Sequence, residues 1–177
     1  MKQGLLDEFA ATNTALIHLL STFSDGELDI MPSAGKWSAG QVTEHLLHSD
    51  NAILESLKGP YRKAIRDPDE KVESIKSAFL NFDLKFTAAE FLEPQKLQHQ
   101  KQSLLHSLMA SREEMTIILQ QHDLSMTPLE EVPGLEGFSK SELLHFVLYH
   151  TQRHMHQLKN IFNSVVAHPT GQSFSNP

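Results

Sequence analysis

The amino-acid sequence predicts an all-α protein folded as a four-helix bundle. Four long stretches repeat their apolar residues at helical spacing, no stretch alternates apolar and polar residues as a strand would, and no segment repeats another. The chain has 177 residues, of which 40% are hydrophobic, and this suits one domain with a sizeable core. We therefore expect a single domain over residues 1–168 and a loose tail over residues 169–177.

The first helix is expected over residues 2–24, ending before Asp25 and Gly26. Its apolar stripe is Leu5, Phe9, Leu16, Leu20 and Phe23. Thr12 and Asn13 interrupt this stripe. The interruption either has no significance or marks a polar layer inside the bundle, where such groups need partners because burying them unpaired is unfavourable.

The second helix has two start signals. Ser38 as N-cap with Gln41 three residues later makes a capping box, and Trp37 with Val42 makes a hydrophobic staple. This helix is expected to run to about Lys58, where a Gly-Pro pair stops it.

The fourth helix begins with the same signals. Ser139 and Glu142 form a capping box, and Phe138 pairs with Leu143 as the staple. The periodic pattern then continues to about Val166. Both helices therefore have well-defined starting points.

A long connection, residues 59–93, separates the second and third helices, with a short helix expected at about 70–80. A connection of this length permits a crossover, so the helix order stays open. Its aromatic residues either close one end of the core or bind a ligand; they are Phe79, Phe82, Phe86 and Phe91. The third helix is expected to have Pro94 in its first turn and to run to about Gln121. We expect Lys101 at the surface, whereas a place near a functional site stays open for Ser111 and Arg112.

Composition restricts the function classes. The net charge is −7 and no Lys/Arg cluster lies on a helix face, so nucleic acid is not an expected partner. The chain has no cysteine, so a metal ion would have to be held by His, Asp or Glu. The N-terminus is too polar for a signal peptide, and no apolar run approaches the ~18 residues of a membrane span. We expect a soluble cytoplasmic protein that does not bind membranes.

Three of the 11 histidines lie on apolar faces of the predicted helices. His150 and His154 are four residues apart on the fourth helix, so their rings project from one face about 6 Å apart along the axis. One such pair is often a chance feature of a core. His45, however, lies on the inward stripe of the second helix. Three buried imidazoles without partners would be unfavourable, and a shared divalent metal ion removes that penalty.

Several neighbours of these histidines have open roles. His48 is a fourth ligand, a general base or a bystander. Gln157 can hold a ligand ring or a substrate, and Glu44 can accept an N–H from a ligand ring. His145 and His156 fall off the inward stripe and are expected to face solvent.

The segments WSAGQVTEHLLHSD and YHTQRHMHQL resemble the DinB/YfiT-like superfamily of metal-dependent proteins. In that family a tryptophan precedes the second helix, a histidine follows about two turns in, and an HxxxH lies on the fourth helix. Trp37, His45, His150 and His154 match these positions. The resemblance implies a four-helix bundle of the DinB/YfiT-like type, a divalent ion, commonly nickel or zinc, with water at open positions, and a homodimer.

Some members of this superfamily are thiol S-transferases that use bacillithiol or mycothiol, and one branch is a mycothiol-dependent maleylpyruvate isomerase. The bacillithiol-transferase pattern resembles HHLADSH. This chain departs from it at Glu44, His48 and Asp50, which argues against bacillithiol in particular.

The sequence supports three functional hypotheses. The first is a metal-dependent enzyme, a thiol transferase or hydrolase, whose three-histidine site activates water or a thiol against a small-molecule substrate. The second is a non-catalytic structural or sensing protein in which the ion fastens two helices. The third is a metal-free bundle that acts as a dimeric interaction module. The sequence identifies no catalytic residue, native metal or substrate.

Overall fold

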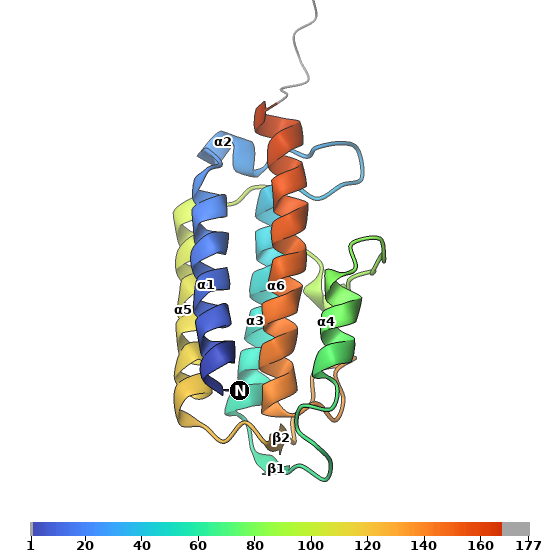
Figure 1. Ribbon diagram of the computed structural model, residues 1–177. Coiled ribbons are helices and arrows are strands. Elements are labelled where there is room, and N and C mark those ends of the chain that lie inside the picture. The colour runs from blue at the N-terminus through green and yellow to red at the C-terminus, as the bar shows by residue number, and fades with distance from the viewer. Residues whose placement is uncertain (1, 168–177) are drawn as a thin grey trace, which may run out of the picture.

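Four long helices form the body of the protein in the computed structural model, which describes residues 2–167 (Figure 1). They are α1 (Lys2–Ser21), α3 (Ala39–Lys58), α5 (Lys101–Gln121) and α6 (Lys140–Phe162). Helices α1 and α3 each pack against both α5 and α6. The predicted all-α class and four-helix bundle are therefore confirmed. The predicted tail, residues 169–177, lies outside the described residues.

The helix order includes a crossover. Helices α1 and α6 run in one direction, and α3 and α5 both run in the opposite direction (Figure 1). The parallel pair α3 and α5 is joined by residues 59–100, which return along the outside of the bundle. Helix α4 (Val72–Leu80) lies on this path and packs against α6. The long connection therefore allows two neighbouring helices to be parallel.

Several short elements complete the chain. They are α2 (Asp25–Leu28), β1 (Tyr61–Lys63), the 3₁₀ turn η1 (Glu90–Leu92), β2 (Met126–Pro128) and the π turn η2 (Asn163–Ala167). Strands β1 and β2 pair antiparallel, with Arg62 opposite Thr127. This two-stranded sheet was not predicted, because strands of three residues are too short to show alternation. None of the described helices combines the length and the apolar character that crossing a membrane requires.

Two predicted helix ends were wrong. Helix α1 stops at Ser21 instead of Ser24, because Ser24 caps the separate helix α2 through a capping box with Glu27. Helix α5 begins at Lys101 instead of near Pro94. Residues 94–100 instead form a loop that contacts α3 at Glu44.

The two predicted capping boxes are present. The Ser38 hydroxyl accepts from the Gln41 N–H at 3.2 Å, and the Ser139 hydroxyl accepts from the Glu142 N–H at 3.0 Å. The side chains of Gln41 and Glu142 accept in return from the backbone N–H of their caps. Helices α3 and α6 therefore begin where the sequence predicts.

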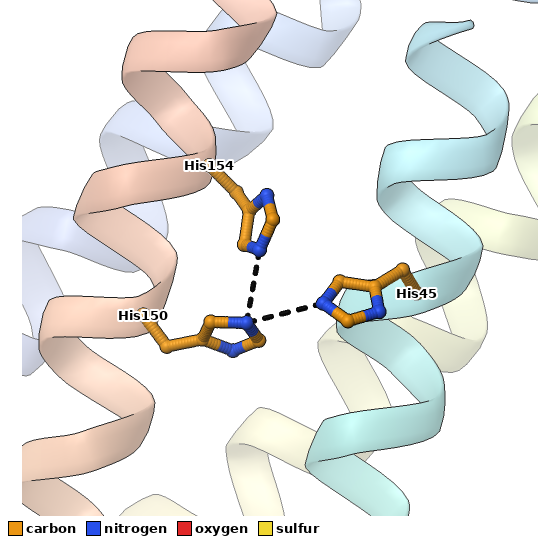
Figure 2. A group of neighbouring side chains, drawn as sticks. All are labelled: His45, His150 and His154. Carbon is orange, nitrogen blue, oxygen red and sulfur yellow. Dashed lines mark hydrogen bonds between the residues drawn. The ribbon is translucent and has the colours of Figure 1, made fainter. Parts of the chain in front are cut away.

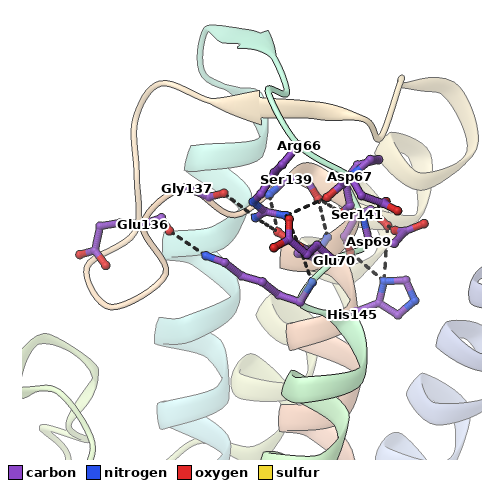
Figure 3. A network of polar contacts seen from close by, with 12 residues as sticks. Arg66, Asp67, Asp69, Glu70, Glu136, Gly137, Ser139, Ser141 and His145 are labelled. Carbon is purple, nitrogen blue, oxygen red and sulfur yellow. Dashed lines mark hydrogen bonds and ion pairs between the residues drawn. The ribbon is translucent and has the colours of Figure 1, made fainter.

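The start of α6 is also fastened to the connection after β1 (Figure 3). Arg66 donates to both carboxylate oxygens of the fully buried Glu142, at 2.6 Å and 2.5 Å, and to the Gly137 carbonyl at 2.8 Å. The Lys71 N–H also donates to Glu142, at 2.8 Å. These hydrogen bonds to the ionised carboxylate lower the pKa of Glu142 although its burial acts to raise it.

A polar layer divides the apolar core into two clusters, one at each end of the bundle. Arg112 of α5 donates through Nε to Asp50 of α3 at 2.8 Å, through Nη1 to Asn13 of α1 at 2.7 Å, and through Nη2 to Thr151 of α6 at 2.9 Å. We call Arg112, Asp50, Asn13 and Thr151 the arginine layer. It confirms that the interruption at Asn13 marks a polar layer, whereas Thr12 accepts only from Gln152 among the described residues.

Candidate metal centre

Helices α3 and α6 bring the three predicted histidines together (Figure 2). The Nε2 atom of His150 lies 3.1 Å from Nε2 of His45 and 2.9 Å from Nε2 of His154. All three side chains are buried. The ligand atoms that they offer lie within 4.8 Å of one another. The sequence therefore predicted which side chains meet.

The outer ring nitrogens of two histidines are held by oxygen acceptors. Nδ1 of His45 lies 2.9 Å from the backbone carbonyl of Leu92, and Nδ1 of His154 lies 2.8 Å from Oε1 of Gln157. A carbonyl oxygen only accepts, so each Nδ1 carries the proton. In the neutral rings, Nε2 of His45 and Nε2 of His154 then carry no proton, and each has a lone pair.

These lone pairs both face one nitrogen. A neutral His150 has at most one proton on Nε2, so it can donate to His45 or to His154 but not to both. Three ligands placed 2.0–2.1 Å from one ion are separated by roughly 2.9–3.4 Å, depending on the bond angle. The measured separations around His150 are close to this range. The three imidazoles can therefore hold one divalent ion, with His45 and His154 in the tautomer that coordination needs.

The protonation states agree with this role. Burial lowers the pKa of His45, and it lowers the pKa of His150 well below its ordinary value. Burial, with the neighbouring His45, lowers the pKa of His154 to about 3. Charged imidazolium is disfavoured so close to two other rings. The neutral rings required of metal ligands are therefore the stable form near pH 7.

A cleft of about 650 Å³ opens at the three histidines. Its apolar walls come from three separate segments of the chain: they include Trp37, Phe79, Phe86, Leu92 and Phe146. The Phe79 ring stacks on Phe86 with centroids 5.2 Å apart and meets the His150 ring edge-on at 5.7 Å. The connection between α3 and α5 therefore supplies part of the cleft wall through Phe79 and Phe86, and Phe79 also packs against the core. Phe82 instead stacks on His156, with centroids 4.1 Å apart.

The loop before α5 supports His45 from outside. Glu44 accepts from the Lys96 N–H and from Nε2 of His99, both at 3.1 Å. Glu44 therefore holds this loop. It does not accept an N–H from a ligand ring, which was the role left open for it. Nδ1 of His99 lies 2.6 Å from Asp29. These contacts fix the chain segment whose Leu92 carbonyl orients His45.

Gly40 is needed where this loop meets α3. A Cβ atom at Gly40 would lie 2.4 Å from Nδ1 of His99 and 2.5 Å from Oδ1 of Asp29. The His99 ring is buried and held on both sides, so it cannot move aside easily. The roles of His99, Asp29 and the Leu92 carbonyl were not predicted, because these partners are 47–70 residues from the groups they contact and show no local pattern.

The other predicted neighbours have distinct positions. His48 lies outside the group of three and faces Glu44, with 3.8 Å between Nε2 and Oε1. Gln157 holds the ring of His154, one of its two expected roles. His156 is exposed as expected, whereas His145 is half-buried and donates through Nδ1 to the Ser141 carbonyl at 2.9 Å. Ser111 bonds the Leu108 carbonyl, and Arg112 belongs to the arginine layer.

Comparisons with known proteins identify the family of the chain. No protein of curated function and no solved structure matches the chain. A family model of the DinB superfamily matches residues 8–158, which include all three clustered histidines and most of the four long helices. The chain therefore belongs to the DinB superfamily.

Proposed function

We propose that this protein is a metal-dependent enzyme in which His45, His150 and His154 hold one divalent ion, nickel or zinc. The observation that carries the proposal is the convergence of three neutral imidazoles on one point. The unprotonated Nε2 atoms of His45 and His154 both face Nε2 of His150, which can carry only one proton. When bound, such an ion supplies Lewis-acid chemistry that lowers the pKa of a water or a thiol.

The side chains around the histidines have separate tasks in this proposal. The Leu92 carbonyl and Gln157 orient two of the rings. Trp37, Phe79 and Phe146 form an apolar wall that limits the access of bulk water. The chain has no cysteine, so a thiol nucleophile would come from a second substrate, a low-molecular-weight thiol.

The cleft favours an enzyme over a structural or sensing ion. Structural zinc sites have four protein ligands and no open position, whereas catalytic sites keep one position for water or substrate. Here three histidines converge at the floor of an open cleft, and His48 lies outside the group. The reaction that we propose is transfer of a thiol to, or hydrolysis of, a small electrophile bound in this cleft.

Metal content is the first test. After re-addition of nickel or zinc, elemental analysis should find about one ion per chain. His45→Ala and His150→Ala should lose the ion, and the matched control His48→Ala, one turn along the same helix as His45, should keep it. Wild-type protein that takes up no ion would rule out the proposed site.

Turnover is the second test. The cobalt-substituted protein should change its absorption spectrum when a thiol is added, and a panel of thiols with chlorodinitrobenzene should reveal transfer that His150→Ala abolishes. If the loaded protein transfers no thiol and hydrolyses no substrate, and its spectrum shows a fourth protein ligand, the ion has a structural role instead.

A further inference from the structure

The cleft at the histidines has cationic side chains that the proposed metal chemistry does not use. Lys36, Lys85 and Arg153 line it, and Glu93 is its only acidic residue among those described. The protein as a whole has a net charge of −7. The cleft is therefore locally positive, although the net charge of the whole chain is negative.

None of these three cations forms an ion pair with a carboxylate among the described residues. Arg153 is half-buried and lies next to the ligand His154 on α6. Its partners are the neutral backbone carbonyls of Phe79, Asn81 and Leu84. A guanidinium in this position keeps its full charge, with no acidic group to balance it.

Arg153 has hydrogen-bond donors to spare. Its side chain has five N–H groups. Two on Nη1 and one on Nη2 are taken by the three carbonyls, which leaves Nε–H and one N–H of Nη2. Its guanidinium also lies over the Phe86 ring, 4.7 Å from the centroid, and so keeps a fixed orientation in the wall of the cleft. Two N–H donors of one guanidinium match the two oxygens of a carboxylate.

The apolar walls indicate the rest of the ligand. Phe79, Phe86 and Phe146 present aromatic surface beside His150. A volume of about 650 Å³ lies within the range of clefts that bind small organic molecules. A molecule with an apolar body and one anionic group fits both the walls and the charge.

We propose that the cleft binds a small organic carboxylate whose anionic group is held by Arg153 and Lys85 and whose apolar part lies against the phenylalanine rings. Arg153 and Lys85 line the same cleft as the three histidines, so the bound molecule lies in the cleft that contains them. This assignment rests on the proposed function only in treating the bound molecule as the substrate. Lys36 is an exposed residue of the cleft lining, and its charge attracts the anion toward the cleft.

Trp37 allows a direct binding test, because it is the one tryptophan of the chain and lines the cleft. The fluorescence of the full-length protein is titrated with benzoate and with the neutral isostere benzamide, after chelation of metal so that benzoate cannot coordinate an ion. Benzoate should bind about tenfold more tightly than benzamide, since hydrogen bonds to charged groups are the stronger ones. Equal affinity for the two probes would overturn the proposal.

Three variants assign the preference to its residues. Arg153→Gln and Lys85→Gln should each weaken benzoate binding about tenfold and leave benzamide binding unchanged. Lys76→Gln, an exposed lysine of α4 outside the cleft lining, should change neither. If Arg153→Gln also weakens benzamide binding, the segment of residues 79–84 whose carbonyls Arg153 bonds has moved. The result for Lys85→Gln then decides whether the cleft recognises the carboxylate. Unchanged benzoate affinity in Lys85→Gln would then overturn the proposal.

Metal content measured on the same samples separates this proposal from the proposed function. Protein that prefers benzoate but takes up no nickel or zinc supports the carboxylate site and contradicts the metal centre. Protein that binds one ion but does not distinguish benzoate from benzamide contradicts the carboxylate site alone.

Discussion

His150 and Thr151 are neighbours on α6, yet they belong to two buried polar clusters of opposite kinds. In the arginine layer, the charge of Arg112 meets the charge of Asp50, and its other donors meet the oxygens of Asn13 and Thr151. In the histidine cluster, bare nitrogens face one another and share at most one proton. The first cluster is complete when the chain folds, whereas the second leaves one nitrogen without a proton to accept, and in our proposal an ion takes the place of that missing hydrogen bond.

Whether a buried polar cluster is fully hydrogen-bonded separates a structural role from a functional one. Truncating one partner of a satisfied cluster leaves an uncompensated charge in the core. Truncating a member of an unsatisfied cluster removes a group that gained little from folding. The two clusters should therefore respond differently to the same kind of substitution, although they are adjacent in the bundle.

Arg112→Met should give the largest effect on stability. It leaves the Asp50 carboxylate buried without its counter-charge, so the free energy of unfolding should fall by about 3–5 kcal/mol, measured by urea denaturation. The double variant Asp50→Leu/Arg112→Met should regain most of this loss, because both charges are then absent. A single variant as stable as the wild type would show that the arginine layer does not hold the core.

His150→Leu is the matched comparison on the adjacent residue. In metal-free protein it should lower the free energy of unfolding by about 1 kcal/mol or less, since it removes one hydrogen bond and fills the space with an apolar side chain of similar size. If it destabilises the metal-free protein as much as Arg112→Met does, the distinction between the two clusters fails.

Acid should destabilise the metal-free protein by less than Arg112→Met does. The pKa of His154 is about 3 in the folded protein and about 6.5 in an unfolded chain, so between these values the unfolded state binds more protons. The stability of metal-free protein should therefore fall as the pH is lowered below 6.5. From pH 7.5 to pH 5, His154 alone should contribute a loss of about 2 kcal/mol.

His154→Leu isolates this contribution. Urea denaturation at several pH values should show a smaller loss for the variant than for the wild type, since the leucine binds no proton. Identical pH profiles for the two proteins would mean that His154 titrates alike in the folded and unfolded states.

Gln157→Leu should weaken metal binding without unfolding the protein, because it removes only the acceptor that orients the His154 ring. Metal affinity should fall by at least about tenfold, equivalent to about 1.4 kcal/mol, while the protein stays folded. Gln152→Leu on the same helix is the control, since Gln152 bonds Glu8 and Thr12 and should leave metal affinity unchanged. Equal metal affinities in the two variants would show that Gln157 does not contribute to metal binding.

Local signals made the bundle and the meeting of the histidines predictable. The capping boxes at Ser38 and Ser139 fix where α3 and α6 begin, and helical periodicity then fixes which faces turn inward. His45, His150 and His154 follow from these two facts. The resemblance in sequence motifs pointed to the same superfamily as the family model.

Features that depend on distant partners were not predictable in this way. Residues 94–100 have a proline where a helix could start, but contacts of Lys96 and His99 with Glu44 and Asp29 keep them in a loop. The wall contributed by Phe79 and Phe86 depends on the path of a long connection back to α6, which no periodicity records. The unpaired charge of Arg153 likewise becomes visible only in three dimensions.

The close approach of His99 to α3 matters for anyone who wishes to make this protein more heat-resistant. Exchanging a helical glycine for alanine is a common stabilising step, worth about 0.5–1 kcal/mol in an unobstructed helix. At Gly40 the added methyl group would instead push His99 and Asp29 away from the helix. The displaced loop follows closely after Leu92, whose carbonyl orients His45, so a choice made for thermal tolerance would loosen a proposed metal ligand. Engineering of α3 should therefore keep Gly40 and begin at positions on its exposed face.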